Sequence, residues 1–518
     1  MAIRNVAGVG SGVASREWWN TPLFMAIAVL LAALPLLWPP IPPLLDLPSH
    51  MGSYHVALNL ESSSSLRKYY DFHWQLVGNL GVDVLVMPLA RLLGVELATK
   101  IIVILIPTLT VAGMIWIARE VHGELPATLG FALPLAYCYP LHFGFVNYCL
   151  GMALMLWGLG LWLRLTRLDR PVLRAGVFAS IAAALWIVHA IGWALLVIAC
   201  GCAELVRRID AGESWRRAAA QSALACVPLC TPVLIMLSLP HRQAAAASGW
   251  FVPQELARWL VTLFRDRWMA CDLVATAIFF AVLCLAMFNV GGMRLRRRLA
   301  LPALALFVTF LVAPQSINDS WFVNGRIAPY ALALLAVAIG TRDATARQRR
   351  GLAIAATAFL VLRTATTTAS MALYSASYAA NLAALDHVEP GTAIVALSPV
   401  PCRPELANWW NPRLYHLASM AIVRKDAFVN TEWQVEGLQA LRTRYAAAKP
   451  FDKDPSELVT LGCEKRPIAR FETAVETFPR AAFDYLWLLG IPRSLWPSDP
   501  DLTLVWSKDD SALFSIAH

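Results

Sequence analysis

The chain has 518 residues, of which 58% are hydrophobic and only 15% are charged, against about 25% charged in an average soluble protein. Long apolar stretches recur through the first 380 residues, which excludes a soluble globular enzyme, a disordered chain and a fibrous repeat. These segments are apolar on every side, whereas the strands of a membrane barrel alternate. The sequence therefore predicts an all-α polytopic membrane domain.

The formal net charge is +9, and its distribution argues against nucleic acid as a partner. The arginines lie in short clusters between apolar segments, as the positive-inside rule explains for a membrane protein. A nucleic-acid-binding protein would instead gather its basic residues on one face or along one helix. We therefore expect membrane lipids, and not nucleic acid, around this chain.

A membrane-spanning helix needs about 20 mostly apolar residues. Candidate spans are found at 22–40, 99–118, 126–141, 145–163, 174–188, 190–206, 218–238, 272–290, 299–313, 327–341 and 351–375. The first follows a basic start but ends in a proline-rich stretch without a small-residue cleavage site. We therefore expect an uncleaved first span and about 11 transmembrane helices.

The apolar stretch 76–94 decides the expected topology. It contains Asn79, Asp83 and Arg91, two glycines and a proline. If it does not cross the membrane, every arginine cluster between spans falls on one side, which the positive-inside rule makes the cytoplasmic side. This predicts a re-entrant or juxtamembrane helix at 76–94, a cytoplasmic N-terminus, and a tail outside the bacterial inner membrane, in the periplasm.

The two expected domains are residues 1–379, which contain the membrane spans and an outer catalytic loop at 41–98, and residues 380–518. The tail is mixed in composition and predicts a soluble α/β domain. Its expected elements are a strand at 392–397, a helix at 414–423 and a hairpin formed by 502–506 and 512–516. Cys402 and Cys463 are the only cysteines there, and an oxidising compartment favours their pairing over two separate thiols.

The first outer loop opens with the strongest candidate for chemistry. Asp46 follows the first span directly, so it lies at the membrane surface, where a carboxylate could act as general base toward a lipid-borne substrate. His50 comes one helical turn later, and His55 follows. The alternative is that Asp46 caps a surface helix beginning near Pro48.

The Asp46-x-Pro-x-His50 opening and the Gly78–Asp83 stretch resemble uncharacterised bacterial members of the GT-C superfamily of membrane glycosyltransferases. The resemblance is architectural and covers roughly residues 20–380: a span, a long outer loop opening with an acid, a non-crossing helix and an Arg-flanked hairpin. It implies a polyprenyl-phosphate sugar donor, a lipid-linked or surface-glycan acceptor, inversion at the sugar, and Asp46 and His50 as catalytic residues.

The second outer loop departs from that resemblance. Many relatives place a second acid there, whereas this chain offers His142 and Asn147, so a metal site built from two acidic loops is not expected. Asp46 with His50, His55 or His142 could still bind Mn²⁺, Mg²⁺ or Zn²⁺. The alternative for His142 and Asn147 is that they satisfy a tight interfacial turn.

A lipid phosphate needs cations at the outer surface. The candidates are Arg326, His241 and Arg242, whereas Arg265 and Arg267 on a surface helix at 254–267 would only reach toward lipid headgroups. His55, His142, Asn147 and His189 are expected to line the cavity. Arg363, inside the last span, is a further functional candidate.

The sequence therefore predicts a GT-C type glycosyltransferase that uses Asp46 as base. The alternatives are a transporter or flippase for a lipid-linked substrate and a non-enzymatic assembly subunit. No internal repeat of the kind found in many transporters is detected.

Overall fold

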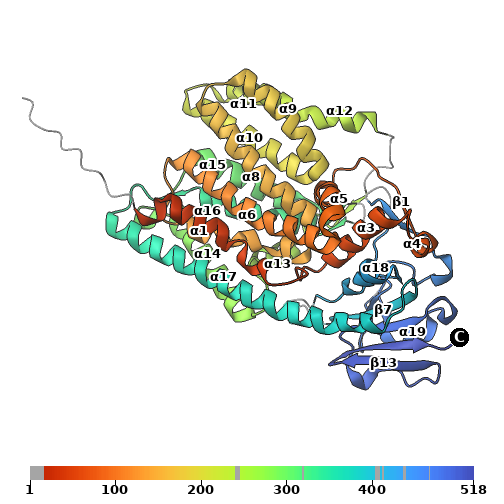
Figure 1. Ribbon diagram of the computed structural model, residues 1–518. Coiled ribbons are helices and arrows are strands. Elements are labelled where there is room, and N and C mark those ends of the chain that lie inside the picture. The colour runs from red at the N-terminus through yellow and green to blue at the C-terminus, as the bar shows by residue number, and fades with distance from the viewer. Residues whose placement is uncertain are drawn as a thin grey trace, which may run out of the picture.

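The computed structural model describes residues 17–239, 246–317, 320–402, 409–410, 413–435, 439–465 and 467–518. Its helices form an elongated body with a mixed sheet at one end, and the long helix α17 runs along the body and reaches that sheet (Figure 1). The helices of the body are α1 (Pro22–Leu31), α2 (Leu34–Leu37), α6 (Val95–His122), α8 (Val146–Arg167), α9 (Pro171–Val188), α10 (Ala190–Asp210), α11 (Trp215–Cys226), α12 (Thr231–Ser238), α14 (Met269–Met287), α15 (Arg297–Val312), α16 (Val323–Val337) and α17 (Ala346–Leu382).

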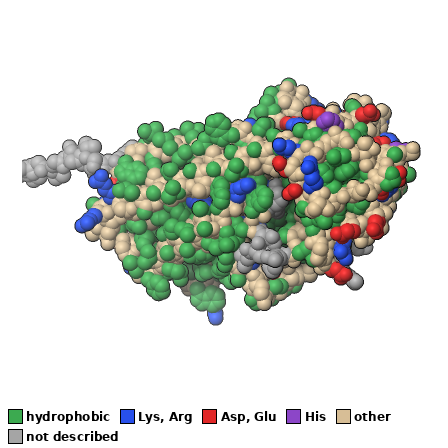
Figure 2. Space-filling model, turned by 90° about the horizontal axis from the view of Figure 1, so that it is seen from below, with side chains coloured by type: hydrophobic (Ala, Val, Ile, Leu, Met, Phe, Trp, Pro, Cys, Tyr) green, Lys and Arg blue, Asp and Glu red, His purple; other side chains and the backbone are tan. Residues whose placement is uncertain are grey.

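Within the described residues, seven helical segments are long and apolar enough to cross a membrane. They are Val95–His122, Val146–Arg167, Pro171–Val188, Ala190–Asp210, Trp215–Ser238, Met269–Met287 and Ala346–His387. Shorter apolar helices, α1 and α16, accompany them, so the count of 11 spans stays a prediction. On the face shown in Figure 2, hydrophobic side chains predominate over the helical body with a few basic side chains among them, and acidic side chains gather toward the end that carries the sheet. This is the surface of a multi-pass membrane protein.

One expected span is wrong. Segment 126–141 forms two 3₁₀ turns, Leu129–Phe131 and Leu133–Tyr137, and leads into the short helix α7 (Tyr139–Phe143). The segment contains three prolines, Pro126, Pro134 and Pro140. Proline interrupts a helix because it removes a backbone hydrogen bond and clashes with the preceding turn. The segment is nevertheless buried, because it packs inside the helical body and not against lipid.

Five short helices belong to the outer loops or precede the sheet. They are α3 (Leu47–Asn59), α4 (Ser64–Tyr69), α5 (Gly81–Leu93), α7 and α13 (Pro253–Val261). At 13 residues α5 is too short to span a bilayer, which agrees with the juxtamembrane helix expected at 76–94. The surface helix expected at 254–267 is confirmed in its first part, as α13.

The tail forms a mixed seven-stranded sheet with strand order β11-β10-β7-β12-β14-β13, and β8 pairs with β7. The strands are β7 (Ala393–Val400), β8 (Phe428–Val429), β10 (Leu458–Thr460), β11 (Ala469–Arg470), β12 (Tyr485–Leu488), β13 (Leu502–Lys508) and β14 (Ser511–Ile516). The helices of the tail are α18 (Met420–Lys425) and α19 (Phe471–Thr477). The expected strand at 392–397 and the terminal hairpin are confirmed, and the helix expected at 414–423 begins later. Cys402 and Cys463 form the expected disulfide.

The first outer loop is bound to the tail through α3 and β1 (Tyr70–Phe72). Strand β1 pairs with β9 (Leu441–Thr443), and α3 packs against α18. On the far side of α3, His55 Nε2 lies 2.7 Å from Asp426 Oδ1. Two further small sheets join β2 (Ala247–Ser248), β4 (Ser316–Ile317) and β5 (Ser320–Trp321), and β3 (Arg294–Leu295) with β6 (Ile339–Gly340). The tail therefore closes over the loop that begins with Asp46.

Candidate functional site

Backbone contacts with the second outer loop fix the position of Asp46. The amides of Leu45 and Asp46 donate to the carbonyls of His142 and Phe143 at 3.2 and 3.0 Å. The two loops approach so closely that a Cβ on Gly144 would lie 2.8 Å from the Asp46 nitrogen, and Gly144 has a φ of +90°. Only glycine combines that conformation with that approach at no steric cost. Two loops separated by about 100 residues are thus joined directly beneath the candidate base.

Among the described residues, no side chain or backbone group forms a hydrogen bond with the Asp46 carboxylate. Asp46 occupies the N-cap position of α3, as the alternative interpretation of this residue had it, but its side chain makes no capping hydrogen bond to the first turn. The side chain is 14% exposed, and His416 Nε2 lies 3.7 Å from its Oδ1. Burial raises the pKa of Asp46 well above its usual range, although attraction by Arg326 opposes the shift. An unengaged carboxylate of raised pKa is a chemically competent base.

His50 lies one turn beyond Asp46, in an aromatic setting. Its ring centroid is 6.1 Å from that of Tyr54 and 5.3 Å from that of Trp433, which belongs to the tail. Burial, helped by repulsion from His416, lowers the pKa of His50 to about 4. His50 is therefore a neutral imidazole near Asp46.

Four ionisable side chains of the tail face this same region, and sequence reasoning did not single them out. His416 and Glu432 are 5% and 1% exposed, and Glu457 is fully buried. Asp454 is close enough to act electrostatically on Asp46 and Glu432, and burial raises the pKa of Glu432 to about 8. We call Asp46, His416, Glu432, Asp454 and Glu457 the acid cluster. Their spacing along the chain follows no motif, so only a prediction of the tail's tertiary structure could have found them.

Arg326 supplies positive charge near Asp46. It lies in the first turn of α16, its Nη2 donates to the Trp321 carbonyl at 2.8 Å, and its guanidinium lies 3.7 Å from the ring centroid of Phe145. Attraction between Arg326 and Asp46 contributes to the electrostatics of both groups. A planar guanidinium fixed by stacking is well suited to bind a phosphate group.

The other expected cavity residues are engaged in structural contacts. Asn147 Nδ2 donates to Asp83 Oδ2 at 2.7 Å, and its Oδ1 accepts from the Val82 amide at 2.6 Å, so it ties α8 to the start of α5. His189 caps α10 by accepting from the Ile191 amide. As described above, His55 faces Asp426. The structure brings Asp46, His50 and Arg326 together, and His189 lies close enough to Arg326 for repulsion from that guanidinium to help lower the pKa of the imidazole. A cavity-lining role for His55, Asn147 and His189 stays a prediction.

His142 belongs to a second buried group of charges, which we call the paired cluster: Asp266, Asp272, Arg363, Arg413 and His142. Arg413 Nη2 lies 2.8 Å from Asp266 Oδ1 and 2.9 Å from His142 Nδ1. Arg363 Nη1 lies 2.8 Å from Asp272 Oδ1, which accounts for the arginine inside the last span. Because Arg413 Nη1 also donates to the Pro43 carbonyl at 2.6 Å, this cluster supports the chain that leads to Asp46.

Of the remaining phosphate candidates, His241 and Arg242 lie outside the described residues, so their role stays a prediction. Arg265 donates to the Trp409 carbonyl at 2.9 Å, and Arg267 lies over the rings of Tyr374 and Trp410.

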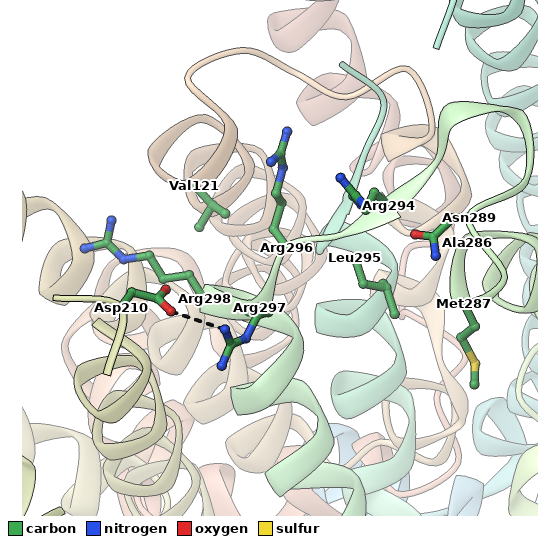
Figure 3. A pocket seen from close by; sticks show the side chains of 10 residues that line it. All are labelled: Val121, Asp210, Ala286, Met287, Asn289, Arg294, Leu295, Arg296, Arg297 and Arg298. Atoms are coloured by element: carbon green, nitrogen blue, oxygen red, sulfur yellow. Dashed lines mark ion pairs between the residues drawn. The ribbon is translucent and has the colours of Figure 1, made fainter. Parts of the chain in front are cut away.

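A separate cavity of about 520 Å³ opens beside Val121, near the C-terminal end of α6 (Figure 3). It is lined by Arg294 of β3 and by Arg296, Arg297 and Arg298 at the start of α15, and Arg297 pairs with Asp210 at 3.4 Å. This end of the molecule is basic and carries none of the acid cluster.

Comparisons with known proteins agree with this geometry. No family model matches the sequence, and no curated protein matches it. Among solved structures, the chain is similar to the crystal structure of ArnT from Cupriavidus metallidurans in the apo state, with 14% identity, a TM-score of 0.52, and coverage of 95% of this chain and 97% of that one. The same ArnT bound to undecaprenyl phosphate is matched with 13% identity and a TM-score of 0.44 over the same shares. The chain therefore shares the fold of the apo ArnT crystal structure over 95% of its length.

Proposed function

We propose that this protein is an integral membrane glycosyltransferase that moves a sugar from a polyprenyl-phosphate donor to a lipid-linked or surface-glycan acceptor. The observation that carries the proposal is the unengaged Asp46 carboxylate, fixed where the first two outer loops meet and near Arg326, on an ArnT-like fold. The donor class is taken from the undecaprenyl phosphate that is bound in the related ArnT crystal structure. The proposed orientation has a cytoplasmic N-terminus and a periplasmic tail, because the arginine clusters then face the cytoplasm.

In this proposal Asp46 takes the proton from the acceptor hydroxyl as that oxygen attacks the anomeric carbon of the sugar. The bond from that carbon to the phosphate oxygen breaks at the same time, so the configuration inverts and polyprenyl phosphate leaves. Arg326 binds the phosphate and stabilises the charge that grows on it. His50 stays neutral and, with Trp433, forms an aromatic wall beside Asp46.

The test is a transfer assay with purified full-length protein in lipid nanodiscs. A panel of short-chain polyprenyl-phosphate sugars is supplied with a lipid extract of the cell envelope, and the release of polyprenyl phosphate is measured. We expect Asp46→Asn to lower transfer by at least about 10²-fold, the low end of the effect of a positioned base. Donor binding should persist, because asparagine keeps the shape of the side chain.

Asp71→Asn is the matched control, since Asp71 is an acid of the same outer loop whose carboxylate pairs with His73 and accepts from the Phe72 amide, away from the acid cluster. It should leave transfer unchanged. Transfer by Asp46→Asn at the wild-type rate would refute the enzymatic role and favour an assembly subunit or a transporter.

A further inference from the structure

Three side chains of the tail that can ligate a metal ion converge beside Asp46. His416, Asp454 and Glu457 each offer one ligand atom, and these atoms all lie within 4.8 Å of one another. His416 lies just before the turn Leu417–Ser419, while Asp454 and Glu457 lie in the turn that leads into β10. The backbone bond from the Asp454 amide to the Glu432 carbonyl, at 3.1 Å, holds the second turn against the chain that follows β8.

The imidazole of His416 has a defined tautomer and orientation. Its Nδ1 lies 3.0 Å from the carbonyl oxygen of Thr431. Because a carbonyl can only accept, Nδ1 carries the proton and Nε2 presents its lone pair. Nε2 points to the acid cluster, 3.7 Å from Asp46 Oδ1. Metal-binding histidines are typically oriented in this way, by donating the other ring N–H to a backbone carbonyl.

The burial of Glu457 is independent evidence that a positively charged ligand binds to this cluster. Its side chain is fully buried, and within the described residues neither carboxylate oxygen has a hydrogen-bond partner outside the cluster, where its neighbour is the Asp454 carboxyl, itself an acid. No lysine or arginine of the described chain forms an ion pair with Glu457 or Asp454. A buried carboxylate without partners is costly, and metal coordination is one of the few ways to satisfy it. Asp454 is only partly buried, so the cluster has a route to solvent.

We propose that His416, Asp454 and Glu457 bind one divalent transition-metal ion, Zn²⁺ or Mn²⁺, at the border between the tail and Asp46. One imidazole nitrogen with two carboxylate oxygens is a donor set that suits these ions. Ligands at about 2.1 Å from one ion lie at most about 4.2 Å apart, so the three side chains need to close by roughly 0.6 Å. Asp46 lies close enough to His416 to be a fourth ligand.

This site extends the proposed function but does not depend on it. It differs from a metal site built on the two outer loops, because all three of its ligands come from the tail. An ion here would balance the charges of Asp454 and Glu457 and place positive charge next to Asp46, on the side where His416 lies. It would also explain why acids of the tail lie close to Asp46 of the first outer loop.

The experiment measures metal binding by tag-free full-length protein in detergent, without sugar donor or acceptor. The protein is stripped with a chelator, dialysed against Zn²⁺ or Mn²⁺, and its metal content is counted by mass spectrometry. We expect one ion per chain in the wild type. Glu457→Gln and His416→Ala should each weaken binding by at least about 100-fold, more than the usual loss of an outer-shell partner.

His73→Ala is the control, because His73 forms an exposed pair with Asp71 that resembles a fragment of the proposed site. It should bind the ion as the wild type does. Co²⁺ gives a second readout, since its visible absorption should appear on the wild type and be lost in Glu457→Gln. If His416→Ala unfolds, the isosteric Glu457→Gln decides. Wild-type protein that binds no ion at millimolar metal, or variants that bind as tightly as the wild type, would overturn the site whatever the transfer assay shows.

Discussion

The paired cluster and the acid cluster lie in the same part of the molecule, yet their charges are arranged in opposite ways. In the paired cluster, Asp266 and Asp272 each have an arginine nitrogen at 2.8 Å. In the acid cluster, no lysine or arginine within the described residues comes within ion-pair distance of a carboxylate. The first arrangement satisfies buried charges inside the fold. The second leaves carboxylates unsatisfied and keeps them available, which is typical of a functional site.

The largest expected effect tests whether the ion pairs of the paired cluster stabilise the fold. Arg363→Met should lower the free energy of unfolding by about 3–5 kcal/mol, because it leaves Asp272 as a buried charge without its cation. Unfolding in detergent, followed by circular dichroism, measures the change. Arg164→Met is the control: Arg164 is 48% exposed in its pair with Glu120, and its loss should cost less than about 1 kcal/mol. Equal stability of the two variants would contradict a stabilising role for the paired cluster.

The same substitution at two aspartates sharpens the comparison. Asp46→Asn should reduce transfer by at least about 10²-fold, or about 2.7 kcal/mol of transition-state stabilisation, and leave the unfolding temperature unchanged or higher. Asp266→Asn should lower the unfolding temperature, because Arg413 loses its carboxylate. Thermal unfolding and donor turnover are measured on both proteins. Loss of stability in Asp46→Asn would place Asp46 among the structural charges.

A smaller effect is expected at Arg326, the cation nearest to the acid cluster. Arg326→Gln should weaken donor affinity by about 10- to 100-fold, the range for one charge-assisted hydrogen bond. Binding of a polyprenyl phosphate to the purified protein measures it. Arg67→Gln, on an exposed arginine of the first outer loop, should change nothing. A similar loss in both variants would indicate general attraction to anionic lipid and not a phosphate site.

The smallest expected effect concerns Asp83, an acid near the membrane that does have a partner. Burial raises its pKa to about 6, opposed by the hydrogen bond from Asn147. The native protein therefore binds more protons than the unfolded chain between about pH 4 and 6, and stability from this group is full below that window and lost as pH rises through it. Asp83→Asn should flatten the pH dependence of unfolding there, by at most about 3 kcal/mol. An unchanged slope would contradict it.

Much of the architecture could be predicted from local sequence. Most helices of the body were predicted from the long apolar segments. In lipid, the backbone N–H and C=O groups of about 20 apolar residues must bond to one another, which a helix allows. The terminal hairpin and the strand at the start of the tail followed from short-range patterns. Segment 126–141 was predicted wrongly, since apolar composition does not distinguish a membrane span from irregular chain that is buried among other helices.

The candidate site, too, could be predicted from the sequence only in part. The sequence by itself determined that Asp46 follows a span at the membrane surface, because apolar length and charge order locate the membrane boundary. Only the tertiary structure decided that the Asp46 side chain makes no capping bond and that His142 and Arg363 pair with other buried charged groups. It also decided that His416, Asp454 and Glu457 meet beside Asp46. Such residues are brought together by sheet pairing and by the docking of the tail on α3, which are contacts over hundreds of residues that leave no periodic signal in the chain.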